Sequence, residues 1–194
     1  MNARLTEKIM DEDPTHDYQV LAMMEKKYEE KDPSYFNEVL LTEPTLVVRV
    51  HAVTALSEIG DESSVPVLAE VMKKDPSPLI RHECAFSLGQ MGLRSAVPYL
   101  CDSALNDPSE IVRHESAAAL GGIGDESARD ALEKASRDPS DEVRGSAIAS
   151  LFNLDFLAYS SKHPLTAIVS EKEEAERARR KLEQTSEPRK MPHP

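Results

Sequence analysis

Two His-Glu dipeptides stand at matching positions in the sequence, His82-Glu83 and His114-Glu115. The two copies are 32 residues apart, and each one follows an arginine and precedes a Leu-Gly-x-x-Gly segment. Imidazole nitrogens and carboxylate oxygens without thiolates suit iron or manganese better than structural zinc. We therefore interpret the repeated dipeptide as the two halves of a metal site, which the surrounding helices must hold at the correct separation.

Each dipeptide falls in a predicted helix whose apolar residues recur on one side. Counted from Arg81 or Arg113, the apolar positions are −1, +3, +7 and +10, which form one stripe at about 100° per residue. These positions hold Ile80, Cys84, Leu88 and Met91, and then Val112, Ser116, Leu120 and Ile123, of which only Ser116 is polar. The histidines stand at +1, nearly opposite the stripe, on a face that core packing does not explain.

The histidine face carries small or apolar residues where a solvated face would carry charged ones. Positions +5 and +8 hold Phe86, Gly89, Ala118 and Gly121. We interpret this face as a second, enclosed surface that lines a pocket, in which the glycines leave room beyond each histidine.

The two residues of one dipeptide do not readily share a target, because adjacent helical side chains diverge by about 100°. We expect at most one dipeptide to supply both metal ligands, while the other supplies its histidine and directs its glutamate elsewhere. Packed helices lie about 8–10 Å apart, a distance that two side chains can bridge through an ion. The alternative is that both dipeptides are ordinary surface residues. His51, which is out of register and has no glutamate after it, is expected to be a packing or surface residue.

An internal repeat of 31–32 residues positions the dipeptides. Arginines at the same place in each copy mark it, at Arg49, Arg81, Arg113 and Arg144. Eleven residues after the first three arginines stand Gly60, Gly92 and Gly124. Such a glycine can adopt the left-handed conformation that ends a helix. The fourth copy has Asp155 there, and we interpret that copy as a terminal cap.

Each copy is predicted to form two short antiparallel helices. Its pattern, Val-Arg-x-x-Ala-x-x-x-Leu-x-x-Ile-Gly, resembles the short HEAT-like repeats of bilin lyases. The predicted fold is all-α, an α-α superhelix in which these hairpins stack into a right-handed solenoid with one concave surface. The predicted domains are a flexible N-terminus (1–16), a HEAT-like repeat domain (17–165), and a charged helix with a disordered C-terminal tail (166–194).

The composition restricts the partners and the compartment. A net charge of −12 over 194 residues argues against nucleic acid, whose binding depends on neutralising phosphates, and against anionic membranes. It suits a cationic partner or substrate, and the alternative is that the acidic balance serves solubility alone. Cys84 and Cys101 make no disulfide framework, which favours a reducing compartment. With no apolar segment long enough to span a bilayer and no signal-like N-terminus, we predict a cytoplasmic protein.

The segments around the two dipeptides, residues 80–91 and 112–124, resemble the paired His-Glu repeats of deoxyhypusine hydroxylase. The resemblance covers about residues 45–155. It implies a HEAT-repeat protein with a non-haem diiron centre that activates oxygen and hydroxylates the deoxyhypusine side chain of a translation factor. Members of that family carry four His-Glu pairs, two in each of two similar halves, with one iron per half.

This chain has two pairs and corresponds to about one half of that arrangement. The resemblance then implies one iron per chain, bound by His82, His114 and Glu115, with Glu83 facing the substrate and holding its ammonium group. A dinuclear centre would need a homodimer, with two irons per dimer, and a hypusine-type translation factor bearing deoxyhypusine as its partner. No catalytic residue beyond the metal ligands and no other cofactor is expected. The alternatives are a non-catalytic HEAT-repeat scaffold or adaptor, and a bilin-lyase-like repeat protein.

Overall fold

The computed structural model describes residues 14–163 and residue 176. Most of the predicted flexible segment 1–16 lies outside the described residues, although its last three residues begin the first described helix. The predicted C-terminal helix and tail, 166–194, lie outside them except for residue 176. The repeats form one compact unit that ends at Leu154, and the description that follows concerns this unit.

Helices account for all the regular structure in the described residues. They are α2 (Pro14–Glu29), α3 (Pro33–Thr42), α4 (Leu46–Ile59), α5 (Val65–Lys74), α6 (Pro78–Met91), α7 (Val97–Asn106), α8 (Glu110–Ile123), α9 (Arg129–Ala135) and α10 (Asp141–Lys162). Short 3-10 turns at Arg94–Ala96 and Glu126–Ala128 precede α7 and α9.

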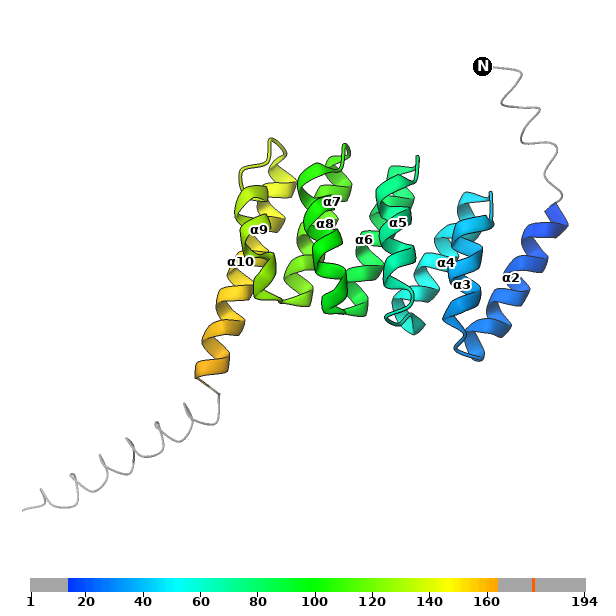
Figure 1. Cartoon of the computed structure of the whole chain (residues 1–194), viewed down its shortest axis with the longest axis horizontal. Coiled ribbons are helices and arrows are strands. Elements are labelled where there is room, and N and C mark those ends of the chain that lie inside the picture. Colours follow the sequence, from blue (N-terminus) through cyan, green and yellow to red (C-terminus); the bar gives the residue numbers. More distant parts are fainter. Residues whose placement is uncertain (1–13, 164–175, 177–194) are drawn as a thin grey trace, which may run out of the picture. The chain divides into compact units, whose positions relative to one another are not determined.

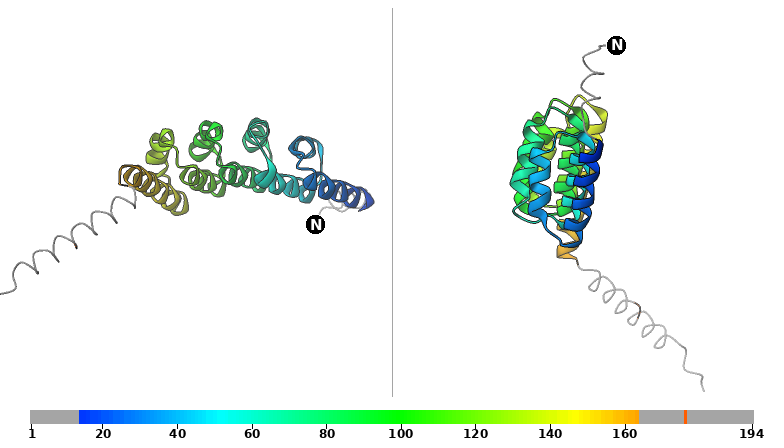
Figure 2. Two further views of the ribbon diagram at one scale, coloured as in Figure 1. Left: turned by 90° about the horizontal axis from the view of Figure 1, so that it is seen from below. Right: turned by 90° about the vertical axis from the view of Figure 1, so that its right-hand side faces the viewer.

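The helices alternate between two layers, which Figure 2 shows end on. The first layer contains α2, α4, α6, α8 and the start of α10, and the second contains α3, α5, α7 and α9. Each hairpin buries its apolar stripes only by stacking on its neighbours. The predicted fold class, an all-α solenoid of HEAT-like hairpins, is therefore confirmed, and both His-Glu dipeptides lie in the first layer, on α6 and α8.

The predicted apolar stripe forms the core between the layers. Six of its members are fully buried: Ile80, Cys84, Leu88, Val112, Ser116 and Leu120. Each large aliphatic side chain buried in this way contributes about 1.5–3 kcal/mol. The polar member, Ser116, donates its hydroxyl hydrogen bond to Ser103 on α7 at 2.8 Å. Burial also raises the pKa of the Cys84 thiol, so this residue is an uncharged core side chain, as expected.

Two of the three predicted helix-ending glycines adopt the left-handed conformation. Gly92 has φ 66° and Gly124 has φ 69°. Gly60 differs, because α4 ends in an extended conformation there, with φ −64° and ψ 154°. A side chain on Gly60 would meet the carbonyl oxygen of Leu56. The requirement for glycine at that position is therefore a close backbone approach, and the left-handed prediction for it was wrong.

The repeated arginines join each hairpin to the next. Arg81 donates to both carboxylate oxygens of Asp107, at 2.8 and 2.9 Å, and to the carbonyl oxygen of Asp75 at 2.8 Å. Both side chains of the Arg81–Asp107 pair are almost fully buried. The hydrogen bonds with Asp107 raise the pKa of Arg81.

Arg113 repeats this arrangement one hairpin later. It donates to Asp138 at 2.8 and 3.0 Å and to the carbonyl oxygen of Asp107 at 2.9 Å. These hydrogen bonds from Arg113 are the main cause of the lowered pKa of Asp138. The arginines therefore fix the step between successive first-layer helices, and with it the positions of the histidines.

Candidate metal centre

The first pair of candidate ligands faces across the gap between α6 and α8. Nε2 of His82 lies 3.4 Å from Oε2 of Glu115, and the two side chains are 28% and 17% exposed. Nitrogen and oxygen ligands lie about 2.1 Å from a divalent transition metal, so two adjacent ligands of one ion are about 3 Å apart. The observed separation suits two ligands of a shared ion.

Both histidine rings are held through Nδ1. Nδ1 of His82 lies 3.3 Å from Oε1 of Glu83. Nδ1 of His114 lies 3.3 Å from the carbonyl oxygen of Glu142 and 2.8 Å from Oγ of Ser146. Metal-binding histidines usually donate the hydrogen of their second ring nitrogen to a carboxylate or a carbonyl oxygen. Both rings therefore have the support typical of a ligand that binds through Nε2.

The third candidate ligand is not gathered with the other two. In the part of the chain that the structure describes, no three His, Cys, Asp or Glu side chains lie close enough together to hold a metal ion. The ring of His114 contacts the first turns of α10, while His82 contacts Glu83 through Nδ1 and Glu115 through Nε2. The donor types fit an iron ion, and two of the three expected ligands stand at ligand spacing.

The glycines do not leave the room that was predicted beyond the histidines, and this part of the sequence interpretation was wrong. Phe86 is 41% exposed, so its face is open to solvent. A Cβ on Gly89 would stand 2.7 Å from Cβ of Ala119, and one on Gly121 would stand 2.7 Å from Cβ of Ser150. The glycines therefore permit close packing of α6 on α8 and of α8 on α10, and they leave no room for a ligand.

Ser146 is the residue at this site that sequence reasoning missed. It stands two residues after Arg144, at the place that Glu83 and Glu115 occupy after their own arginines. The repeat register was thus the signal that could have identified it. His51 shares that place on α4 and is exposed, so of the two roles expected for it, packing or surface, the structure shows the surface one.

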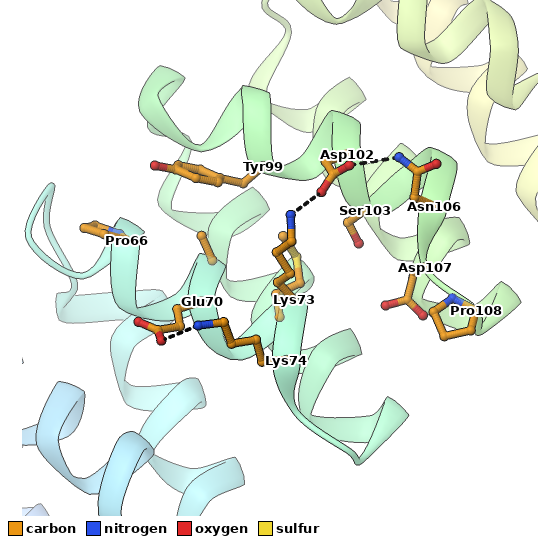
Figure 3. Close-up of a pocket in the computed structure, with 12 residues that line it drawn as sticks. Pro66, Glu70, Lys73, Lys74, Tyr99, Asp102, Ser103, Asn106, Asp107 and Pro108 are labelled. Carbon is orange, nitrogen blue, oxygen red and sulfur yellow. Dashed lines mark hydrogen bonds and ion pairs between the residues drawn. The ribbon is translucent and has the colours of Figure 1, made fainter.

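A separate groove lies on the second layer, between α5 and α7 (Figure 3). Its volume is about 570 Å³. Lys73 on α5 donates to Asp102 on α7 at 3.1 Å across the groove, and Lys74 pairs with Glu70 at its edge. Tyr99 contributes an aromatic surface. This groove belongs to helices of the layer opposite the histidines.

A sequence profile of HEAT repeats matches residues 3–84, 35–121 and 66–152. The chain belongs to the HEAT-repeat family. Among solved structures, this HEAT-repeat protein is similar to human deoxyhypusine hydroxylase in complex with glycerol, with 35% identity and a TM-score of 0.60. The similarity covers 66% of this chain and 45% of the human chain. The chain therefore spans less than half the length of that enzyme.

A second similar structure is the complex of CpcE and CpcF of phycocyanin lyase from Nostoc sp. PCC7120. It shares 20% identity with this HEAT-repeat protein over 63% of this chain and 64% of that chain, with a TM-score of 0.49. At this level the likeness gives no argument about function. No curated protein matches the sequence. Within the described residues, no helix has the length and apolar character needed to cross a membrane.

Proposed function

We propose that this protein is an iron-dependent, oxygen-activating hydroxylase of the deoxyhypusine hydroxylase type. The observation that carries the proposal is the facing of His82 Nε2 and Glu115 Oε2 at 3.4 Å in a chain 35% identical to that enzyme. The acidic composition supports a cationic substrate. The reducing compartment that suits two free cysteines is the cytoplasm.

His82, His114 and Glu115 would hold the iron ion. Two imidazoles and one carboxylate are a recognised ligand set for non-haem iron, and they leave coordination positions open. Iron bound there supplies oxygen activation for insertion of an oxygen atom into a C–H bond. Glu83 and the first turns of α10 hold the two rings by their Nδ1 atoms, so both Nε2 atoms are available to the metal.

Glu83 would also hold the ammonium group of the substrate. Its Oε1 atom contacts His82, which leaves Oε2 for a cation. The side chain is 25% exposed at the open face of α6, where an extended aminobutyl-lysine chain can approach. The substrate class we propose is therefore a deoxyhypusine side chain on a translation factor of the hypusine type.

A second copy of the chain would complete a two-iron centre. The chain corresponds to 45% of the human enzyme, so two copies are needed to supply a comparable number of His-Glu pairs. An exposed aliphatic row supports such a contact, because Val47, Leu79 and Ile111 occupy the same place in three successive first-layer helices. Exposed apolar rows of this kind mark interaction surfaces.

The first experiment measures iron. The purified chain is loaded with ferrous iron without oxygen, and metal per chain and molecular mass are determined together. We expect one iron per chain and a dimer, with iron lost in His82→Ala and in His114→Ala. His51→Ala is the matched control, because His51 is an exposed histidine on the neighbouring helix α4, and it should retain full iron.

The second experiment measures hydroxylation. The iron-loaded protein is incubated with a translation factor bearing deoxyhypusine, with oxygen and a reductant, and the mass of the factor is followed. Addition of one oxygen atom is the expected result. An iron-loaded dimer that leaves the mass unchanged would exclude this substrate and keep the oxygenase class. A protein that binds no iron would exclude the hydroxylase altogether.

The second candidate function is a non-catalytic scaffold, which the groove between α5 and α7 favours. This groove has charged pairs and Tyr99 along its walls and lies on the layer opposite the histidines. A scaffold that uses it would bind its partner equally well with or without iron. Its binding would also be lost in Tyr99→Ala, whereas it would be retained in His82→Ala.

A further inference from the structure

The two histidines meet the next helix of the first layer by the same step. His82 stands one residue after Arg81 and contacts Glu115, which stands two residues after Arg113. His114 stands one residue after Arg113 and contacts Ser146, which stands two residues after Arg144. The repeat therefore places one residue of the following helix against each imidazole.

The contact of His114 with α10 bears on which of its two ring nitrogens carries the hydrogen. A backbone carbonyl oxygen accepts hydrogen bonds and cannot donate them. A hydrogen bond between Nδ1 and the carbonyl oxygen of Glu142, which lie 3.3 Å apart, requires the ring hydrogen on Nδ1. That tautomer carries its lone pair on Nε2, the atom that a metal would bind.

Ser146 makes the shorter contact to the same nitrogen, at 2.8 Å. Its hydroxyl oxygen can accept from Nδ1 beside the carbonyl, since both groups lie on the first turns of α10. One contact alone allows the ring to tilt, whereas two contacts from points one helical turn apart fix its plane. Among the described residues, Nε2 of His114 has no hydrogen-bond partner, so nothing in that part of the chain competes for it.

We propose that Ser146 is a positioning residue that fixes the tautomer and the plane of His114, and so presents Nε2 of that ring as a ligand atom. The metal part of this inference rests on the proposed function. The tautomer part does not, because it concerns the chain without iron. The contact between His114 and α10 then needs no carboxylate, because the Ser146 hydroxyl supports the ring. The proposed carboxylate ligand is Glu115, which lies on α8.

The test uses the full chain with 15N-labelled histidine. In the iron-free protein at about pH 8.5, where imidazole is neutral, the nitrogen shifts of His114 should show hydrogen on Nδ1. In Ser146→Ala they should move toward a mixture of the two tautomers, and Ser146→Thr, which keeps a hydroxyl, should restore them. Ser161→Ala is the matched control on α10, because its hydroxyl donates within the helix to Ala158.

Ferrous iron binding, measured without oxygen, gives the second readout. Ser146→Ala should weaken it by about 10–100-fold, as loss of a supporting residue does at other metal sites, while thermal unfolding stays close to wild type. Unchanged nitrogen shifts in Ser146→Ala, or hydrogen on Nε2 in the wild type, would overturn the inference. Shifts that depend on Ser146 in a chain that binds no iron would support the positioning role and exclude the proposed function.

Discussion

The step from α6 to α8 and the step from α8 to α10 use the same positions of the repeat, but the first turns Nε2 of the histidine toward the next helix and the second turns Nδ1 toward it. In the first, the His82 ring lies between two carboxylates, Glu83 and Glu115. In the second, the His114 ring lies against a hydroxyl and a backbone carbonyl oxygen of α10. The repeat brings the same position of the next helix against each ring, and the residue type at that position decides whether the ring meets a carboxylate or a hydroxyl.

This difference also explains how adjacent side chains divide their roles. Neighbouring helical residues diverge by about 100°, yet Glu83 turns back to Nδ1 of His82. The carboxylate that faces Nε2 comes from the next helix, as Glu115. In the first dipeptide one contact lies within the helix, between Glu83 and His82. In the second the two side chains reach different neighbours, His114 toward α10 and Glu115 toward α6.

The largest effect is expected when the residue of α8 that faces His82 is replaced by serine, the residue type that α10 has at the same position of the repeat. Glu115→Ser replaces the carboxylate that faces Nε2 of His82, and it should weaken ferrous iron binding by more than about 100-fold. A lost ligand costs more than a lost supporting residue, whose removal costs about 10–100-fold. Anaerobic calorimetry measures the affinity. Glu110→Ser, at an exposed position of the same helix, should bind iron as the wild type does.

An intermediate effect is expected from the arginine that spaces the second step. Arg113→Leu leaves Asp138 without its partner in a largely buried site, and breaking such a pair costs about 3 kcal/mol of unfolding free energy. Arg144→Leu is the comparison, because it also removes hydrogen bonds to backbone carbonyl oxygens, but the carboxylate that Arg144 pairs with is the exposed Asp141 on its own helix, where pairs contribute about 0–1 kcal/mol. Urea unfolding measures both. Equal losses of unfolding free energy in the two variants would show that the buried arginine–aspartate pairs do not set the spacing between the hairpins.

The Arg113–Asp138 pair also makes the stability of the folded chain depend on pH, and the direction of that dependence follows from the pKa of Asp138. The pKa of Asp138 is lowered in the folded chain, chiefly by the hydrogen bonds from Arg113. Its contribution to stability is therefore complete above the ordinary aspartate pKa of about 3.9 and is lost as the pH falls through the lowered value. The stability difference between wild type and Arg113→Leu should narrow below about pH 4, whereas a constant difference would contradict this account.

The smallest effect is expected from two neighbouring glycines on α8. A Cβ on Gly121 would stand 2.7 Å from Cβ and 2.9 Å from Cα of Ser150, so Gly121→Ala should push α10 away and cost about 1–3 kcal/mol. A Cβ on Gly122 meets nothing within 4 Å, so Gly122→Ala should be neutral or stabilise the helix by up to about 1 kcal/mol. Thermal unfolding of both variants measures the two stabilities. A loss of stability in Gly122→Ala alone would contradict the expected order.

Periodicity was a reliable guide to the helices and to their buried sides. The stripe that includes Ile80, Leu88 and Leu120 is buried as predicted, because burial of a helix face depends on a spacing that the sequence states directly. The opposite face was misjudged. Gly89 was interpreted as space for a ligand, but it contacts Ala119 of the neighbouring helix, and a single repeat contains no information about which of its faces a neighbour covers.

The hairpins, their stacking and the common register of the two His-Glu dipeptides could be predicted from the residues, because each follows from local spacing. Which atoms meet could not be predicted in that way and is seen only in the folded chain. The tertiary structure placed Glu115 against Nε2 of His82 and turned Nδ1 of His114 toward Ser146. Contacts across 31–33 residues depend on the offset between stacked helices, and that offset is set by buried arginine–aspartate pairs and close glycine packing acting together.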